Sequence, residues 1–352
     1  MAPAHQYTTS CPSGLTDAIL KLHYLAEGAA NIIYSVSVVS PVSLQEHDHC
    51  CVMRLRKDLP STKPAVQTFS DFEKRIVPLF AGHETLLMEQ ALYKLSPEMI
   101  EGANRELVEM DGMDISAVSA DGTNAQGKSE RRIRHHHRRH IYLPSYNEEQ
   151  YGILMPNLED PGLDWLIEFK PKWLVQSPSA PRDARNCRTC ALNAMRRRTR
   201  RHQGRSDSGF CPLDLLESGD ILENALARIW PIEEGLQAFA ATFIKRIQPA
   251  LSHLRALQQT HGSVGLQDFE NPAGKDFGLA MALRDCSVFL AMRRQEEAGG
   301  IDLVNVKLAD LDLKTGEGGK FQKWAGTEQD LLDGGWYHRV EDSNCSLSRH
   351  KS

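Results

Sequence analysis

Glu168-Phe169-Lys170-Pro171-Lys172-Trp173 is the stretch of sequence around which the second half of the chain is organised. Residues 163–167 before it are largely apolar and predict a buried strand. Side chains alternate along a strand, so Lys170 and Lys172 are predicted to lie on the same side. Pro171 restricts itself and Lys170 to extended conformations, and the two ammonium groups therefore suit the binding of a polyanion.

Composition favours a large globular protein with an anionic ligand. The 352 residues are 41% hydrophobic, which is enough for a sizeable core and two lobes. The net charge is −5. No stretch approaches the roughly 20 apolar residues of a membrane span, and residues 1–10 lack the layout of a secretory signal. We expect a monomer in the nucleus or cytoplasm, without a membrane partner. An acidic total with basic local segments favours a small anion over nucleic acid.

The first lobe is predicted to contain a nucleotide-covering loop. A short helix or turn is predicted over residues 15–25, a strand over residues 32–39 and another over residues 50–55. Between the first two lies Glu27-Gly28-Ala29-Ala30-Asn31, whose small residues let a backbone approach phosphate closely, although ordinary turns share this pattern. Arg54 on the third segment is placed to supply a cation to nucleotide phosphates; the alternative is an edge strand with solvated charges.

The rest of the first lobe is predicted to be helical, with one insertion. Helices are expected across residues 69–110, and residues 111–140 are interpreted as a mobile basic insertion. Three consecutive histidines, residues 135–137, are not expected to face one metal ion. A strand over residues 151–155 leads to the connector, so that residues 1–155 form the first lobe and residues 156–352 the second.

A one-sided arginine cluster follows the lysine motif. Asp183 is the only acid between Pro181 and Arg205. Such a run is often a solvated helix face, but its repulsion favours a bound anion. The eight cysteines are expected to be reduced. Cys187 and Cys190 lie inside the cluster, and the local charge and the poor spacing to His202 and Cys211 argue against zinc.

Two aspartates are predicted to meet at the ends of neighbouring strands. A short helix over residues 277–283 precedes strands over residues 286–292 and 301–308, joined by a glycine turn. Because the ends of antiparallel neighbours lie together, Asp285 and Asp310 are expected to be adjacent. One can accept a hydroxyl proton and the other hold Mg²⁺, although helix caps and turns also favour aspartate.

Six short stretches carry a family resemblance when they are taken in chain order: Glu27-Gly28-Ala29-Ala30-Asn31, Arg54-Leu55-Arg56-Lys57, Glu168-Phe169-Lys170-Pro171-Lys172, Cys211-Pro212-Leu213-Asp214-Leu215, Arg284-Asp285-Cys286-Ser287 and Asp310-Leu311-Asp312-Leu313-Lys314. Together they resemble the inositol-pentakisphosphate 2-kinase family over about residues 25–324. The resemblance implies an α+β, two-lobed kinase-like fold, with an antiparallel sheet in the first lobe and a larger mixed α/β second lobe that carries inositol-phosphate-binding helices. It also implies ATP-dependent phosphorylation, with Mg²⁺, of the 2-hydroxyl of inositol 1,3,4,5,6-pentakisphosphate to the hexakisphosphate, phytate.

The resemblance assigns roles residue by residue. Asp285 resembles the catalytic base, Lys170 the group that stabilises the transferred phosphoryl, and Asp310, assisted by Asp312, the metal ligand. Nucleotide contacts are implied for Gly28, Ala30, Asn31, Arg54 and Asp310. Substrate contacts are implied for Lys172, Arg188, Arg196, Arg228, Lys314, Lys320 and Trp324. The chain departs from the family at Leu192, where a histidine is frequent, and the zinc of plant members lies in a different insertion, so the resemblance implies no zinc here.

Two alternatives remain from the residues themselves. Val306-Lys307-Leu308-Ala309-Asp310 looks like the strand that leads to the metal-binding aspartate of a protein kinase, but the chain has no His-Arg-Asp loop and no Ala-Pro-Glu sequence. A polyanion- or RNA-binding module would use the arginine cluster. That module leaves Asp285 and Asp310 without a purpose, and the aromatics expected for stacking on bases are missing from the cluster.

Overall fold

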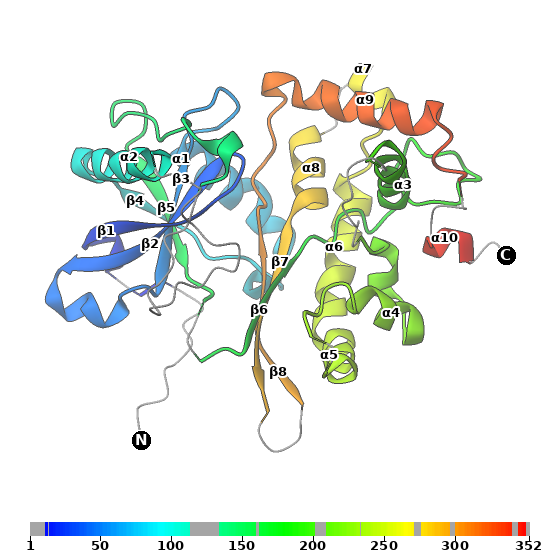
Figure 1. Ribbon diagram of the computed structural model, residues 1–352, viewed down its shortest axis with the longest axis horizontal. Helices are drawn as coiled ribbons and strands as arrows, with labels where there is room; N and C mark the ends of the chain where they lie inside the picture. The colour runs from blue at the N-terminus through cyan, green and yellow to red at the C-terminus, as the bar shows by residue number, and fades with distance from the viewer. Residues whose placement is uncertain are drawn as a thin grey trace. The chain divides into compact units, whose positions relative to one another are not determined.

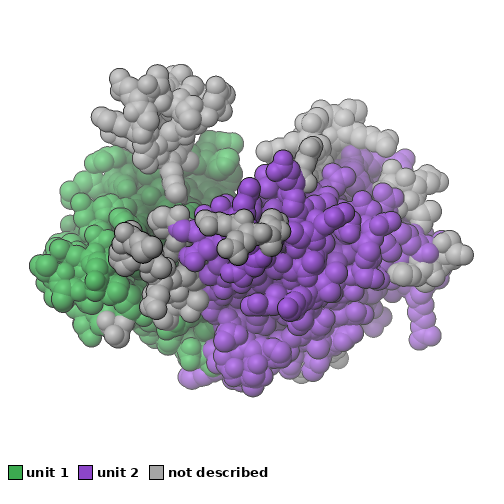
Figure 2. Space-filling view, turned by 90° about the horizontal axis from the view of Figure 1, so that it is seen from below, with its two compact units in different colours: residues 1–73, 88–160 green, residues 74–87, 161–352 purple. Residues whose placement is uncertain are grey.

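The computed structural model describes residues 11–12, 14–112, 134–159, 162–200, 209–232, 234–270, 276–295, 300–339 and 344–349 (Figure 1). The chain divides into two compact units, residues 1–73 with 88–160 and residues 74–87 with 161–352, which Figure 2 colours separately. The grouping of residues 74–87 with the second unit was not predicted. The fold is α+β, as predicted, with a five-stranded antiparallel sheet in the first unit and a three-stranded sheet in the second. Among the described residues, every helix is too short or too polar to span a bilayer.

The sheet of the first unit has the strand order β1-β2-β3-β5-β4. Its strands are β1 (Ile19–Glu27), β2 (Asn31–Ser40), β3 (Cys51–Arg56), β4 (Ala91–Lys94) and β5 (Tyr151–Pro156). The predicted strands that correspond to β2, β3 and β5 are confirmed. The predicted helix or turn over residues 15–25 is wrong beyond the 3-10 turn Leu15–Asp17, because Leu20 and its neighbours alternate between buried and exposed along β1. The helical prediction across residues 69–110 is wrong at β4.

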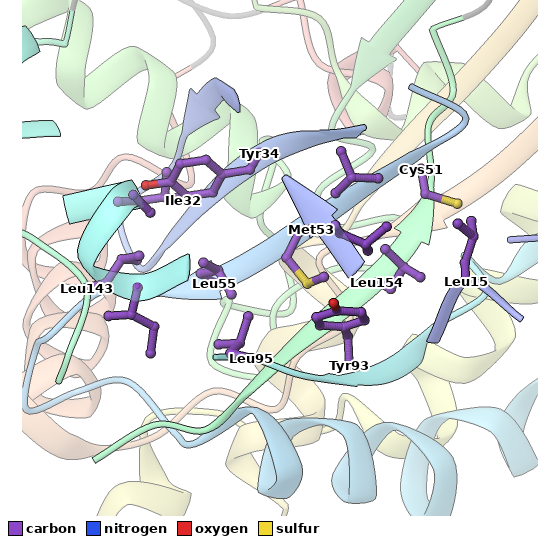
Figure 3. Packing of buried hydrophobic residues seen from close by; sticks show 14 of the residues in the cluster. Leu15, Ile32, Tyr34, Cys51, Met53, Leu55, Tyr93, Leu95, Leu143 and Leu154 are labelled. Carbon is purple, nitrogen blue, oxygen red and sulfur yellow. The ribbon is translucent and has the colours of Figure 1, made fainter. Parts of the chain in front are cut away.

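One helix and the central strands build the core of the first unit. The helix α2 (Pro97–Asp111) begins after Ser96, whose Oγ accepts a hydrogen bond from the Met99 amide at 3.3 Å, with proline at the first helical position. It contacts β1 and buries Ile100, Ala103, Leu107 and Met110. Figure 3 shows side chains of β2, β3 and β5 packed in the same cluster: Ile32, Tyr34, Met53, Leu55 and Leu154.

A buried charge network fastens the segment before β5 to the first hairpin. The Glu27 carboxylate receives Lys57 Nζ at 2.6 Å and Arg134 Nε at 3.1 Å, and these three side chains are at most 2% exposed. Arg134 also donates to both carboxylate oxygens of Asp111 at 3.0 Å, and to the Ile141 carbonyl at 2.8 Å. Residues 134–140, assigned from the sequence to a mobile insertion, are therefore anchored through Arg134. The remainder of that insertion, residues 113–133, lies outside the described residues.

The second unit contains a three-stranded antiparallel sheet, in the order β6-β7-β8, together with most of the helices. The strands β6 (Trp165–Phe169), β7 (Ser287–Arg294) and β8 (Ile301–Ala309) match the predicted ones closely. The helices are α3 (Arg188–Arg200), α4 (Gly219–Leu226), α5 (Leu236–Thr242), α6 (Gln248–His261), α7 (Gln267–Glu270), α8 (Phe277–Asp285), α9 (Lys320–Asp333) and α10 (Ser346–Arg349). A short helix α1 (Ala65–Asp71) belongs to the first unit.

The charge network generates a stability prediction. Glu27→Gln is expected to destabilise the protein by about 3 kcal/mol at pH 7, because Lys57 would stay buried without its carboxylate partner and Arg134 would keep only the Asp111 carboxylate. Urea denaturation measures the change. Glu109→Gln, at an exposed position of α2, is the control and should change stability by less than about 0.5 kcal/mol.

The stabilisation that Glu27 contributes depends on pH in a defined way. Burial raises the pKa of Glu27, but Arg134 and Lys57 outweigh it and hold that pKa below its usual range. The stabilisation is therefore complete above the unfolded-state pKa of about 4.3 and is lost as the pH falls through the lower folded-state value. Equal stability of Glu27→Gln and the unsubstituted protein at pH 7 would contradict the role assigned to the network.

Candidate functional site

The lysine motif follows directly from the end of β6. The strand ends at Phe169, and Lys172 has a left-handed backbone with a φ of 55°. The prediction that both lysines lie in one extended run is therefore wrong at Lys172. The turn nevertheless brings both ammonium groups to one residue: Lys172 Nζ donates to Asp285 Oδ1, and Lys170 Nζ to the Asp285 carbonyl, each at 2.8 Å.

Gln258 of α6 supports this turn from inside the unit. Its side chain is 1% exposed. The carboxamide oxygen accepts the Leu174 amide at 2.8 Å, and the carboxamide nitrogen donates to the Lys172 carbonyl and to the Leu283 carbonyl, each at 2.9 Å. Leu283 lies in α8, two residues before Asp285. One amide group therefore ties the turn that carries Lys172 to the end of the helix that carries Asp285.

The two aspartates meet as the strand pattern predicted. Asp285 ends α8 and Asp310 follows β8; the pairing of Ser287 with Ala309 places these two ends side by side. Lys170 Nζ lies 3.0 Å from Asp310 Oδ2, and Ser287 Oγ lies 3.2 Å from the same oxygen and 2.7 Å from Glu168 Oε1. Lys170 thus bridges the two aspartates.

The segment after Asp310 runs close to α8. Leu311 and Leu313 are buried while Asp312 between them is half-buried, as expected for an extended chain. The Lys314 amide donates to the Gly278 carbonyl at 3.2 Å, and a Cβ at Gly278 would lie only 2.7 Å from the Lys314 carbonyl oxygen. Glycine at this position lets the segment approach the helix, which leaves Lys314 Nζ 4.0 Å from Asp285 Oδ2.

Neighbouring lysines keep both carboxylates ionised. Burial raises the pKa of Asp285, but Lys172, Lys170 and Lys314 lower it to below its usual range. The pKa of Asp310 is lowered in the same way, since Lys170 and Lys314 outweigh burial. Burial alone lowers the pKa of Lys170, yet Asp310 and Asp285 raise it overall. Asp285, Asp310 and Lys170 are therefore charged at neutral pH.

A basic cavity of about 410 Å³ adjoins this cluster. Its wall comes from Lys172 and Trp173, from α3, α8 and α9 (Figure 1), and from residues 264–266. Asp285 lies on this wall. Six basic side chains line the cavity: Lys172, Arg188, Arg196, Arg284, Lys320 and Lys323. The pKa of Lys320 is lowered by burial and by the nearby Lys314, as expected where positive charges gather before an anion binds.

Two arginine side chains that line the cavity stack on the ring of Trp173. Arg284 is 2% exposed, and its guanidinium lies 3.6 Å from the centroid of the Trp173 ring, while that of Arg188 lies at 4.7 Å. Arg188 Nε donates to Glu328 Oε2 at 2.9 Å, whereas Nε and Nη1 of Arg284 find no hydrogen-bond partner among the described residues. Burial, and then Arg188, lower the pKa of Arg284 to about 9.

The structure brings together most, but not all, of the substrate-contact residues assigned from the sequence. Lys172, Arg188, Arg196, Lys320 and Trp324 line the cavity, and Lys314 lies beside Asp285. Arg228 is exposed after α4 and is not part of the described cavity wall. Sequence reasoning missed Arg284, Lys323 and Glu328. The position of Arg284 directly before Asp285 was the available signal for the first of them.

Of the residues assigned to nucleotide, Gly28, Ala30, Asn31 and Arg54 lie in the first unit and Asp310 lies in the second. The Gly28 amide donates to the Asn31 carbonyl and the Lys57 amide to the Ala30 carbonyl, each at 2.8 Å, so the turn between β1 and β2 is held at both ends. A Cβ at Gly28 would meet only the Asn31 carbonyl oxygen at 3.9 Å, so the fold leaves space for a side chain there. Arg54 is 7% exposed on β3, with Nη2 3.4 Å from Gln90 Oε1.

The histidines at residues 135–137 do converge. A 3-10 turn, His136–Arg138, brings one ring nitrogen of each within 4.8 Å of the others, so the expectation that three consecutive histidines cannot face one point is wrong. All three are exposed.

A basic cavity with the ionised Asp285 on its wall is suited to an anionic ligand. The family model of inositol-pentakisphosphate 2-kinase matches residues 24–256 and 250–330. The chain therefore belongs to this family, as the six motifs predicted. An inositol-pentakisphosphate 2-kinase of Yarrowia lipolytica is 34% identical over 195 residues. The match covers 54% of this chain and 60% of the yeast protein, which is less than two thirds of the relative's length.

The support that Gln258 gives to the site can be tested by stability. Gln258→Met keeps the size of the side chain but leaves the Leu174 amide and the Lys172 and Leu283 carbonyls without their partner. We expect a loss on the order of 3 kcal/mol, measured by urea denaturation. Gln329→Met, on the exposed face of α9, is the control and should change stability by less than about 0.5 kcal/mol. Similar values for the two variants would show that the Gln258 bonds do not hold the turn.

Proposed function

We propose that this protein transfers the γ-phosphate of ATP to the 2-hydroxyl of inositol 1,3,4,5,6-pentakisphosphate and so forms the hexakisphosphate. One observation carries the proposal. The ionised Asp285 lies on the wall of the basic cavity and, on its other side, contacts the lysine that reaches Asp310. Asp285, which can accept a proton, thus lies on the wall of the cavity suited to a polyphosphate. It also contacts Lys170, which pairs with Asp310, and we assign these residues to phosphoryl transfer.

The charge of the cavity supports the choice of acceptor. Five phosphates, each with about −1.5 to −2 charges near neutral pH, give the substrate roughly eight to ten negative charges. Six basic side chains line the cavity against two acids, Asp285 and Glu328. Charge-assisted hydrogen bonds contribute about 1.5–3 kcal/mol each, so several of them together bind such a ligand tightly even after desolvation. We assign Lys172, Arg188, Arg196, Lys320 and Trp324 to the substrate, with Arg284 beneath them.

Asp285 is placed to act as the general base. As the inositol oxygen forms its bond to phosphorus, its proton passes to the Asp285 carboxylate, while the bond from phosphorus to the β-phosphate oxygen breaks and releases ADP. Lys172 and Lys170 keep this carboxylate deprotonated between turnovers. Lys170, between Asp285 and Asp310, is assigned to the charge that develops on the phosphoryl oxygens.

Asp310 and Asp312 are assigned to Mg²⁺. Asp310 is exposed and both are carboxylates, the hard oxygen ligands that this ion takes. They do not form a group of three converging protein ligands within the described ranges, which fits an ion that keeps waters and takes substrate phosphates as its other ligands. When bound, the ion neutralises charge on the transferred phosphoryl group.

We assign the nucleotide to Gly28, Ala30, Asn31 and Arg54 of the first unit. Support comes from the small side chains at the turn and from the largely buried cation on the neighbouring strand. In this proposal the first unit is the nucleotide lobe and the second the substrate lobe of a kinase-like fold. The protein acts as a monomer in the nucleus or cytoplasm, without nucleic acid.

The central test is product formation together with one substitution. Incubation with Mg-ATP and inositol 1,3,4,5,6-pentakisphosphate should yield the hexakisphosphate, resolved by anion-exchange chromatography. Asp285→Asn should lower kcat at least about 100-fold, because the amide cannot accept the proton. Its Kd for the substrate, measured by calorimetry, should change much less.

Asp302→Asn, on the exposed side of β8, is the control for this test and should keep full activity. Absence of hexakisphosphate across a range of pH and Mg²⁺ concentrations would overturn the proposed function. A variant Asp285→Asn that loses binding and turnover in parallel would instead show that Asp285 has a structural role.

Lys172 is predicted to act mainly by charge. Lys172→Ala should raise the substrate Kd about 10- to 30-fold at low ionic strength, since one charge-assisted contact is lost. The loss should shrink as salt is added, because the Lys172 side chain is 40% exposed and its charge is screened. Lys245→Ala, an exposed lysine outside the described cavity wall, should leave Kd unchanged. A salt-independent loss for Lys172→Ala would contradict the electrostatic role.

A further inference from the structure

We propose that Cys187, Cys190, Cys211 and Cys345 bind a zinc ion that fastens the start of α3 to the C-terminal segment. All four are buried, and their sulfur atoms lie within 4.8 Å of one another. They come from three separate parts of the second unit: the start of α3, the residue before the 3-10 turn Pro212–Leu216, and the residue before α10. The site lies apart from the proposed phosphoryl-transfer residues.

The distances between the sulfur atoms fit a tetrahedral metal site. Zinc–sulfur bonds of about 2.3 Å in a tetrahedron place the sulfurs about 3.8 Å apart. The Sγ atoms of Cys187 and Cys211 are 3.9 Å apart, and those of Cys211 and Cys345 are 3.8 Å apart. A disulfide needs about 2.05 Å. The four side chains therefore have the spacing of ligands around one ion.

Backbone amides and apolar neighbours complete the surroundings of the cluster. The Cys187 amide lies 3.1 Å from Cys345 Sγ, and the Cys190 amide lies 3.5 Å from Cys187 Sγ, the kind of contact that stabilises thiolate ligands. Leu213 and Leu347 pack against the four cysteines. An apolar shell around the ligands limits the access of water to the ion.

The structure removes both sequence-based arguments against zinc. The missing partner is Cys345, 134 residues after Cys211 in the chain, which no local spacing reveals. Two arginines of the arginine cluster that line the cavity have other surroundings than the four sulfurs. Arg188 donates to Glu328 and stacks on Trp173, and Arg196 is exposed at the cavity wall. The side chains of these two arginines are therefore engaged at the cavity and not at the four sulfurs.

The ion would fix the helix that supplies two cavity residues. Cys187 directly precedes α3, and Cys190 lies in its first turn, while Arg188 and Arg196 of the same helix line the cavity. The C-terminal segment is held to this region by the Ser348 hydroxyl, which donates to the Arg185 carbonyl at 2.7 Å, and by the pair of Arg349 and Asp214. Zinc is thus assigned a positioning role that does not depend on the reaction catalysed.

Metal content of the unmodified protein tests the proposal. The full chain, purified under reducing conditions without chelator or added metal, should contain one zinc per molecule by inductively coupled plasma mass spectrometry. Exchange for Co²⁺ should give intense sulfur-to-cobalt charge-transfer absorption and the visible bands of a tetrahedral site. This spectrum separates the thiolate site from the exposed histidines at residues 135–137, which give no such charge transfer. Absence of zinc, with no uptake and no thiolate spectrum on titration, would overturn the proposal.

Two variants locate the ion. Cys345→Ser should lose most of the zinc and lower the thermal midpoint, whereas Cys50→Ser, a cysteine outside the cluster, should keep one zinc per molecule. If Cys345→Ser does not fold, the cobalt spectrum of the unmodified protein still decides the ligands. A folded Cys345→Ser protein with full zinc content and an unchanged cobalt spectrum would exclude the site. Because these readouts are independent of kinase activity, they remain valid if the proposed function fails.

Discussion

The carboxamide of Gln258 is the interaction on which the geometry of the site depends. Asp285 ends one helix and Lys172 lies in a turn after a strand, and nothing in their local sequence fixes the distance between them. The amide joins the two through three hydrogen bonds to backbone groups, all in a buried environment where an unmade bond costs about 1–3 kcal/mol. The left-handed conformation of Lys172, unfavourable for a non-glycine residue, is held by these bonds.

The same region balances charges that would otherwise repel. Lys170, Lys172 and Lys314 surround two carboxylates, and without Asp285 and Asp310 the three ammonium groups would face one another. In the proposed function, a phosphate that enters the cavity would compete with Asp285 for Lys172. Substrate binding and release of the proposed base would then be linked through one ion pair.

Sequence patterns predicted the parts of this site that depend on local periodicity. Apolar strands ending at Phe169 and Ala309 were readable, and antiparallel pairing then placed Asp285 beside Asp310. What depended on distant contacts was not readable. The alternation in β1 was taken for a helix or turn, and the turn at Lys172 needs Gln258. Arg284 is held by stacking on Trp173 and by hydrogen bonds to the Gly262 and Val264 carbonyls. The four cysteines converge only because the C-terminal segment returns to α3.

The pair formed by Asp111 and Arg134 brings together two residues that are 23 positions apart in the chain. Both side chains are buried in the network around Glu27, so these two points of the chain are fixed next to each other. The cost of closing a loop rises by only about 0.6 kcal/mol for each doubling of its length. A protein engineer can therefore choose the sequence between these two residues for the insertion of a reporter domain, because the buried pair fixes the distance that the insert has to span.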